Sequence, residues 1–147
     1  MSTEADEKAL QLLETAVVKA QSSLEKTKYF QPFLLLLTDT GKIEEYENNI
    51  DDATQSYENL ELLLSERIAQ NDIDIMILAV DTLIPSQVAK GVPQGIRLHL
   101  EERSQKEHKI GARFLYIPYE LCSSSKEALY VKLHLPLPVG FPAEYIV

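Results

Sequence analysis

The segment Phe33–Leu37 is apolar at every position, and it limits the folds open to this chain more than any other feature. Successive side chains of a β-strand point to opposite faces of its sheet, so a strand without polar positions must be covered on both sides. Pro32 stands directly before the segment, where a strand tolerates proline. The segment therefore predicts a central strand with packed elements on both faces of its sheet.

Two segments with helical periodicity can supply that cover. The first spans residues 3–26, and its apolar positions are Ala9, Leu13, Ala16, Val17, Ala20 and Leu24. The second is predicted from Asp51 or Asp52, either of which can cap a helix, to about Gln70. Its expected buried stripe comprises Ala53, Tyr57, Leu60, Leu64 and Ile68.

Strand patterns occupy most of the remaining chain. Residues 42–47 suit the return strand of a hairpin, and residues 73–83 form a second, mostly apolar strand. Residues 95–103, 112–121 and 127–135 predict an antiparallel meander. The predicted fold is a single α+β domain over residues 1–147, in which two helices pack on one mainly antiparallel sheet of about six strands, in the order α-β-β-α-β-β-β-β. Residues 136–147 contain three prolines and are expected to form an extended tail on the surface.

The charge balance favours some partners over others. The chain has 23 acidic and 14 basic residues, a formal net charge of −9, which disfavours nucleic acid and anionic membranes and suits a basic protein partner. No apolar run approaches the roughly 18 residues of a membrane span, and "MSTEADEKAL" lacks the pattern of a signal peptide. Cys122 is the only cysteine, so no internal disulfide can form. We therefore expect a cytoplasmic protein.

Asp39-Thr40-Gly41 matches the tripeptide that carries the catalytic aspartate of aspartic proteases. Such an enzyme needs two of these motifs, from two lobes or two subunits. The only similar tripeptide is Asp81-Thr82-Leu83, which lacks the glycine and lies too near to belong to a second lobe. Asp and Gly between two strand patterns favour a hairpin, because Gly accepts a positive φ. We predict a turn here rather than a protease site.

Asp39 and Asp81 also suggest an alternative, a metal-dependent hydrolase. If the strands that they end are parallel neighbours, both carboxylates lie at one edge of the sheet, where Mg²⁺ could bind them. The competing interpretation is that each aspartate ends its strand by bonding to nearby backbone N–H groups. The histidines lack the close ligand spacing of a zinc site, and no phosphate loop or other cofactor motif is present, so no cofactor is expected.

Tyrosines and basic residues of the last two predicted strands form a candidate partner surface. It comprises Arg113, Tyr116, Tyr119, Tyr130 and Lys132. Antiparallel pairing could place Tyr116 or Tyr119 near Tyr130. The strand at residues 95–103 suggests one wet sheet face, because its alternate positions are Arg97, His99 and Glu101. On such a face the tyrosines would form an exposed patch for a second copy of the chain, whereas packing under a helix would bury them.

Two segments resemble a family of small uncharacterised bacterial proteins. They are "PFLLLLTDTGKI" at residues 32–43, with its Pro-Phe strand and glycine turn, and "GIRLHLEERSQKEHKIGARFLYIPYEL" at residues 95–121, with an "IR-L-LE-R … PY" strand pair. The resemblance covers most of residues 30–120. Glu120 and Leu121 depart from it, because a basic run often stands there, and "PLPVGFPAEY" replaces a Tyr-Gly-Glu element. The family implies no activity and no site residue.

Two functions follow as expectations. The first is a non-enzymatic binding or adaptor module with a protein partner or a second copy of itself. The alternative is a metal-dependent hydrolase that uses Asp39 and Asp81.

Overall fold

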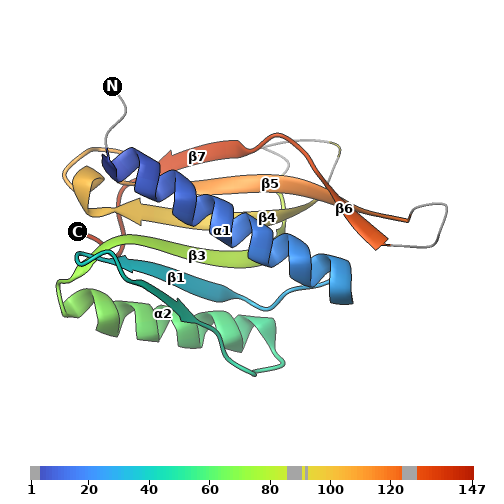
Figure 1. The fold of residues 1–147 in the computed structure, drawn as a ribbon, viewed down its shortest axis with the longest axis horizontal. Helices are drawn as coiled ribbons and strands as arrows, with labels where there is room; N and C mark the ends of the chain where they lie inside the picture. The colour runs from blue at the N-terminus through green and yellow to red at the C-terminus, as the bar shows by residue number, and fades with distance from the viewer. Residues whose placement is uncertain (1–3, 86–90, 92, 124–128) are drawn as a thin grey trace.

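Two helices and a curled antiparallel sheet form an α+β fold, which confirms the predicted fold class (Figure 1). The computed structural model describes residues 4–85, 91, 93–123 and 129–147. The elements along the chain are α1 (Glu4–Thr27), β1 (Phe33–Thr38), β2 (Ile43–Tyr46), α2 (Ala53–Ala69), β3 (Ile73–Leu83), β4 (Gln94–Glu102), the short 3₁₀ helix η1 (Arg103–Gln105), β5 (Ala112–Ser123), β6 (Leu129–Leu133) and β7 (Leu137–Phe141).

The strands are arranged in the order β2-β1-β3-β4-β5-β6, and β7 also pairs with β5. Every pairing is antiparallel. β5 is long enough to hold both last strands, with β7 beside residues 112–116 and β6 beside residues 119–123. β3 and β4 therefore lie in the middle of the sheet, and β1 lies one strand from an edge.

Helix α1 covers one face of the sheet (Figure 1). Its buried residues are Ala9, Leu12, Ala16, Ala20 and Leu24. They contact the alternate side chains of the strands, among them Phe33, Leu35, Ile77 and Leu98. The predicted stripe is thus shifted slightly, because Leu12 is fully buried while Leu13 and Val17 are only partly so.

Helix α2 packs on the opposite face, over β1 and β3. Asp52 caps it, since the Asp52 side chain accepts hydrogen bonds from the backbone N–H groups of residues 54 and 55. Leu60 and Leu64 are buried as predicted, but Ala53 is exposed and Ser56 is buried instead. The Ser56 hydroxyl donates to the side chain of Asn48 over 2.7 Å, which explains how a polar residue fits there. β1 is therefore covered on both faces, as its sequence predicts.

The expectation of an extended surface tail at residues 136–147 is wrong, because the first half of this segment contains a strand and Ile146 in the second half is buried. Leu137–Phe141 forms β7, in register with β5 from Tyr116 to Ala112. Strand β7 is an edge strand that pairs with β5. Proline is tolerated in an edge strand, because the free edge needs no N–H donor. Pro138 therefore does not prevent the pairing.

Candidate functional site

Asp39-Thr40-Gly41 forms the turn between β1 and β2. The Gly41 N–H donates to the Thr38 carbonyl over 3.0 Å, and the Thr38 N–H donates to the Lys42 carbonyl over 2.9 Å. Gly41 has a φ of 86°, which glycine adopts without the penalty that a Cβ atom brings. The side chain of Asp39 is exposed. The prediction of a turn is confirmed.

Asp39 and Asp81 lie far apart in the sheet. β1 and β3 run antiparallel, and Thr38 at the end of β1 lies opposite Ile73 at the start of β3. Asp81 lies near the other end of β3. The predicted common sheet edge is therefore wrong, because it required parallel strands. Among the residues that the structure describes, no group of three or more His, Cys, Asp and Glu side chains could hold a metal ion.

Asp81 instead forms a hydrogen bond with a tyrosine on the face of the sheet that α1 covers. The Tyr119 hydroxyl donates to Asp81 Oδ1 over 2.7 Å. Burial raises the pKa of Asp81, and the bond from Tyr119 opposes that rise only in part. Burial and the bond to Asp81 both raise the pKa of Tyr119. The contact is thus a cross-strand hydrogen bond rather than the bond to backbone N–H groups that the competing interpretation expected.

The candidate partner surface does not form one patch. Tyr116 and Tyr119 are 5% and 3% exposed and lie on opposite faces of β5. Tyr130 lies opposite Cys122 rather than opposite either tyrosine. The tyrosines of β5 are therefore packed, as the burial alternative expected. The exposed members of the predicted surface are Arg113, Tyr130 and Lys132.

The expected wet face of β4 is also wrong. His99 and Glu101 lie on the α2 side of the sheet, and each is 1% exposed. His99 Nε2 is 2.6 Å from Glu101 Oε2. Burial by itself raises the pKa of Glu101, but the bond from His99 and three backbone N–H donors outweigh it, so the pKa of Glu101 is lowered. An ionised carboxylate only accepts hydrogen bonds, so His99 donates from Nε2.

Glu101 also anchors the last residues of the chain. Its Oε1 accepts hydrogen bonds from the backbone N–H groups of Glu144, Tyr145 and Ile146, over 3.2, 3.0 and 2.9 Å. The Tyr145 ring then packs with its centroid 5.4 Å from that of His99. His99 and Glu101 are therefore occupied in holding the C-terminal segment against the sheet.

Arg97 is the third polar residue on this side of β4, and it lies beside two aromatic rings. Its Cζ is 4.4 Å from the ring centroid of Phe114 and 5.5 Å from that of Tyr57. Nη2 donates to the Tyr57 hydroxyl over 2.9 Å, whereas Nε is buried without a hydrogen-bond partner. In the described parts of the chain, the arginines that form ion pairs are Arg67, Arg103 and Arg113. Arg97 has no such partner there.

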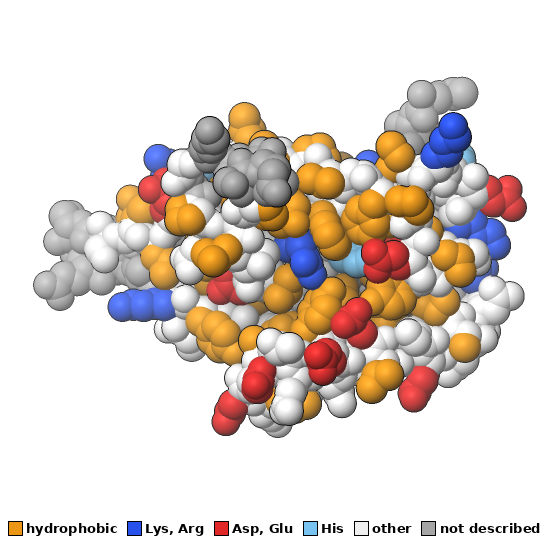
Figure 2. Space-filling model, turned by 180° about the vertical axis from the view of Figure 1, so that it is seen from behind, with side chains coloured by type: hydrophobic (Ala, Val, Ile, Leu, Met, Phe, Trp, Pro, Cys, Tyr) orange, Lys and Arg blue, Asp and Glu red, His pale blue; other side chains and the backbone are white. Residues whose placement is uncertain are grey.

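We use the name Arg97 face for one part of the sheet surface. It lies on the same side of the sheet as α2, next to that helix, and is formed by β4, β5 and β7. Its partly exposed members are Arg97, Phe114 and Val139 on the strands and Tyr57 on α2, and the buried Tyr116 packs beside Phe114. The strand register places them together, because Arg97 lies opposite Tyr116 and Phe114 lies opposite Val139. Figure 2 shows the molecule from this side, with a basic side chain and a histidine in the middle of a broad apolar area, an acidic side chain beside the histidine and further acidic side chains below it.

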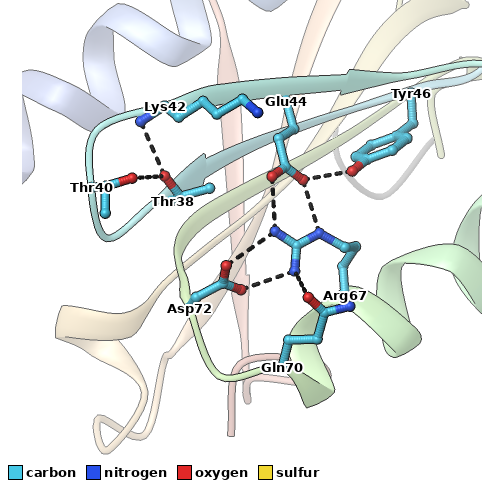
Figure 3. Close-up of polar contacts among 8 residues, drawn as sticks. All are labelled: Thr38, Thr40, Lys42, Glu44, Tyr46, Arg67, Gln70 and Asp72. Carbon is cyan, nitrogen blue, oxygen red and sulfur yellow. Dashed lines mark hydrogen bonds and ion pairs between the residues drawn. The ribbon is translucent and has the colours of Figure 1, made fainter.

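Arg67 is an arginine whose positive charge is balanced by carboxylates of the same chain (Figure 3). Its Nε and Nη2 donate to the two carboxylate oxygens of Glu44, both over 2.9 Å, and its Nη1 donates to Asp72 over 2.9 Å. Bonds from Arg67 and then from Tyr46 lower the pKa of Glu44 to about 2. This network ties the end of α2 to β2 and to the start of β3, so its role is structural.

A groove at the other end of the sheet is a weaker candidate. It has a volume of about 380 Å³, and its lining includes Lys8, Asp74, Glu102 and Arg103. Arg103 already pairs with Asp74 over 3.6 Å. The groove shares no residue with the Arg97 face, and its arginine is already paired with an acidic residue.

Comparisons with protein-family models, with curated proteins and with solved structures found no match. The site must therefore be argued from its own residues. The sequence placed Arg97 correctly on the polar side of its strand, but the rings of Tyr57 and Phe114 beside it were not predicted. The available signal was an arginine between apolar positions, opposite a strand with aromatic residues.

Proposed function

We propose that this protein is a non-enzymatic binding module and that the Arg97 face contacts its ligand. The observation that carries the proposal is the guanidinium of Arg97, which stacks on Phe114 and has no ion pair within the described residues. Apolar surface with a few well-placed polar donors is typical of binding sites. Arg97 supplies the polar donors, and the rings supply the apolar contacts.

Binding fits this face better than catalysis. General acid–base catalysis needs a titratable group within hydrogen-bonding reach of a substrate. The His99 and Glu101 side chains are buried and bonded to each other, and Glu101 also binds three backbone N–H groups. The face therefore offers recognition by charge and by packing.

A protein partner or a second copy of the chain remains our proposal for the wider surface. The formal charge of −9 supports a basic partner and argues against nucleic acid and anionic membranes. None of the helices in the described ranges is long and apolar enough to span a membrane. A cytoplasmic setting agrees with a single cysteine that lacks an internal partner.

The alternative of a metal-dependent hydrolase has lost its structural basis. It required Asp39 and Asp81 at one sheet edge, and the antiparallel pairing of β1 with β3 separates them. A thermal-shift titration with Mg²⁺ and Mn²⁺ tests the alternative directly, because a ligand of the folded state raises its stability. A rise that disappears in Asp39→Asn would support the hydrolase against our proposal.

Capture experiments test the binding proposal. The wild type, Phe114→Ala and Leu10→Ala serve as baits in a lysate of the source organism. Leu10 is a matched control, because it is 57% exposed on α1, away from the Arg97 face. We expect a captured protein to be lost with Phe114→Ala and retained with Leu10→Ala. Equal capture by all three baits would contradict the use of this face.

A further inference from the structure

The guanidinium of Arg97 has donors left for a ligand. Nη2 uses one N–H for the Tyr57 hydroxyl, and Nε is buried. Nη1 is not among the buried atoms that lack a partner, and it donates to no described residue, so it reaches solvent. Nη1 is therefore free to bind an acceptor at the surface, and the second N–H of Nη2 has no acceptor among the described residues.

This arrangement leaves the guanidinium of Arg97 without a hydrogen-bonded or ion-paired carboxylate among the described residues. A charge that is partly removed from water needs hydrogen-bonded acceptors or an opposite charge. The Phe114 ring gives some cation–π attraction, but within the described part of the chain the guanidinium donates only to the neutral Tyr57 hydroxyl. Arg67, in contrast, is surrounded by Glu44 and Asp72. The environment of Arg97 therefore suits an anion that is supplied by a ligand.

We propose that Arg97 binds the carboxylate of a ligand whose remaining part is apolar. The proposal rests on the proposed binding function and names the chemistry of its ligand. A carboxylate has two oxygens that can accept from the free N–H groups of Nη1 and Nη2, and charge-assisted bonds of this kind are the strong ones. The carboxylate supplies the missing negative charge.

The surroundings of Arg97 fit an apolar ligand body. The rings of Phe114 and Tyr116 lie with centroids 6.0 Å apart, and the Phe141 ring centroid is 4.5 Å from that of Phe114. Val139 lies opposite Phe114 on the neighbouring strand. A ligand held at Arg97 would therefore place its carbon skeleton over aromatic and aliphatic side chains, where burial of apolar surface adds affinity.

The same surroundings disfavour a ligand with two negative charges. Burial raises the pKa of Tyr57, the charge of Arg97 opposes this, and the charges of Glu61 and Glu144 add to it. The charges of two carboxylates therefore act on Tyr57, whose hydroxyl accepts the hydrogen bond from Arg97. They would repel the second charge of a phosphate monoester more than they repel a single carboxylate.

The test is a titration of ¹⁵N-labelled full-length protein, followed through the amide shifts of β4 and β5. The probes are phenylacetate, the neutral phenylacetamide of the same shape, phenylphosphonate at a pH above its second pKa, where it is doubly charged, and acetate without an apolar body. We expect saturable shifts near Arg97 with phenylacetate and at least about tenfold weaker binding of the other three. The tripeptide Gly-Gly-Phe with a free or an amidated C-terminus distinguishes a peptide carboxylate from a free small acid as the source.

Three variants separate a charge effect from a folding effect. Arg97→Met should weaken phenylacetate binding at least about tenfold, and Arg97→Lys should lie between it and the wild type, because lysine keeps the charge and loses the fork. Arg103→Met is the control and should bind as the wild type does.

Equal shifts with phenylacetamide, unchanged in Arg97→Met, would overturn the carboxylate assignment while leaving the face a binding surface. Absence of shifts with every probe at millimolar concentration would overturn it too, and the capture experiment would then decide the binding function separately.

Discussion

The backbone N–H of Ile146 donates a 2.9 Å hydrogen bond to Oε1 of Glu101, 45 residues earlier in the chain. The same oxygen accepts from the backbone of Tyr145, and Oε2 accepts from His99. Ile146 is itself buried among the side chains under α2. One carboxylate in the middle of the sheet thus positions the end of the chain and, through it, the border of the Arg97 face.

Glu101→Gln should destabilise the fold by about 2 to 4 kcal/mol, because the neutral amide offers one acceptor oxygen to His99 and three backbone N–H groups that now share the two oxygens of a carboxylate. Urea unfolding measures the loss, and amide exchange should accelerate in residues 144–146. Glu107→Gln is the control, since Glu107 is exposed, and it should change the free energy of unfolding by less than about 0.5 kcal/mol. Equal stability of the two variants would show that the anchor contributes nothing.

The Glu44–Arg67 pair predicts a pH dependence of stability. The pKa of Glu44 is lowered to about 2, chiefly by its bonds from Arg67, from an ordinary value of 4.5. A carboxyl with a depressed pKa in the folded state stabilises the fold fully above its unfolded pKa, and this contribution is lost as the pH falls toward 2. The free energy of unfolding should therefore fall by about 2 to 3 kcal/mol on this account between pH 5 and pH 2.

The matched variants for this pH dependence lie next to each other on β2. Glu44→Gln should flatten the acid limb of the stability curve measured by urea unfolding. Glu45→Gln should leave its slope nearly unchanged, because Glu45 is more exposed and pairs with Lys19 rather than with an arginine. A curve of the same steepness in Glu44→Gln and the wild type would assign the acid sensitivity to other carboxyls, Glu101 first among them.

Gly41→Ala should cost about 1 kcal/mol of stability, through the positive φ of the turn. A Cβ at this position would meet no atom within 4 Å, so the cost comes from the backbone and not from a clash. Gly41→Asn should cost less, because asparagine tolerates this conformation. Asp39→Asn should be nearly neutral in thermal unfolding. A neutral Gly41→Ala would mean that the turn adopts a second conformation.

Much of the fold could be predicted because local pattern and packing agree in it. The uniform apolarity of residues 33–37 required cover on both faces, and α1 and α2 provide it. Strand β7 was missed because its pairing depends on a position at the side of the sheet, where Pro138 costs no hydrogen bond. The sequence could not decide whether β1 and β3 are parallel neighbours, as the metal-site alternative required, since nothing within either strand identifies its neighbour.

The site was less predictable, because its character depends on contacts between distant segments. Alternating polar residues on β4 suggested a wet face, yet the C-terminal segment supplies the N–H donors that let Glu101 be buried. The stacking of Arg97 involves Tyr57 from 40 residues earlier and Phe114 from the next strand. The sequence shows the arginine but not the absence of its counter-ion in the described structure.

We keep the prediction of a homodimer but now place its interface on the edge strand β6. Tyr130 is 46% exposed on this strand, and aromatic residues at a sheet edge suit contact with a second copy. The Val131 N–H already donates to Glu25 over 3.2 Å, so we expect the contact to use side chains rather than an added strand.

Sedimentation at micromolar concentration should show a dimer that Tyr130→Ala weakens. Tyr29→Ala, which removes a tyrosine of similar exposure at 41%, should leave it intact. A monomer at every concentration, or equal effects of the two variants, would reject β6 as the interface.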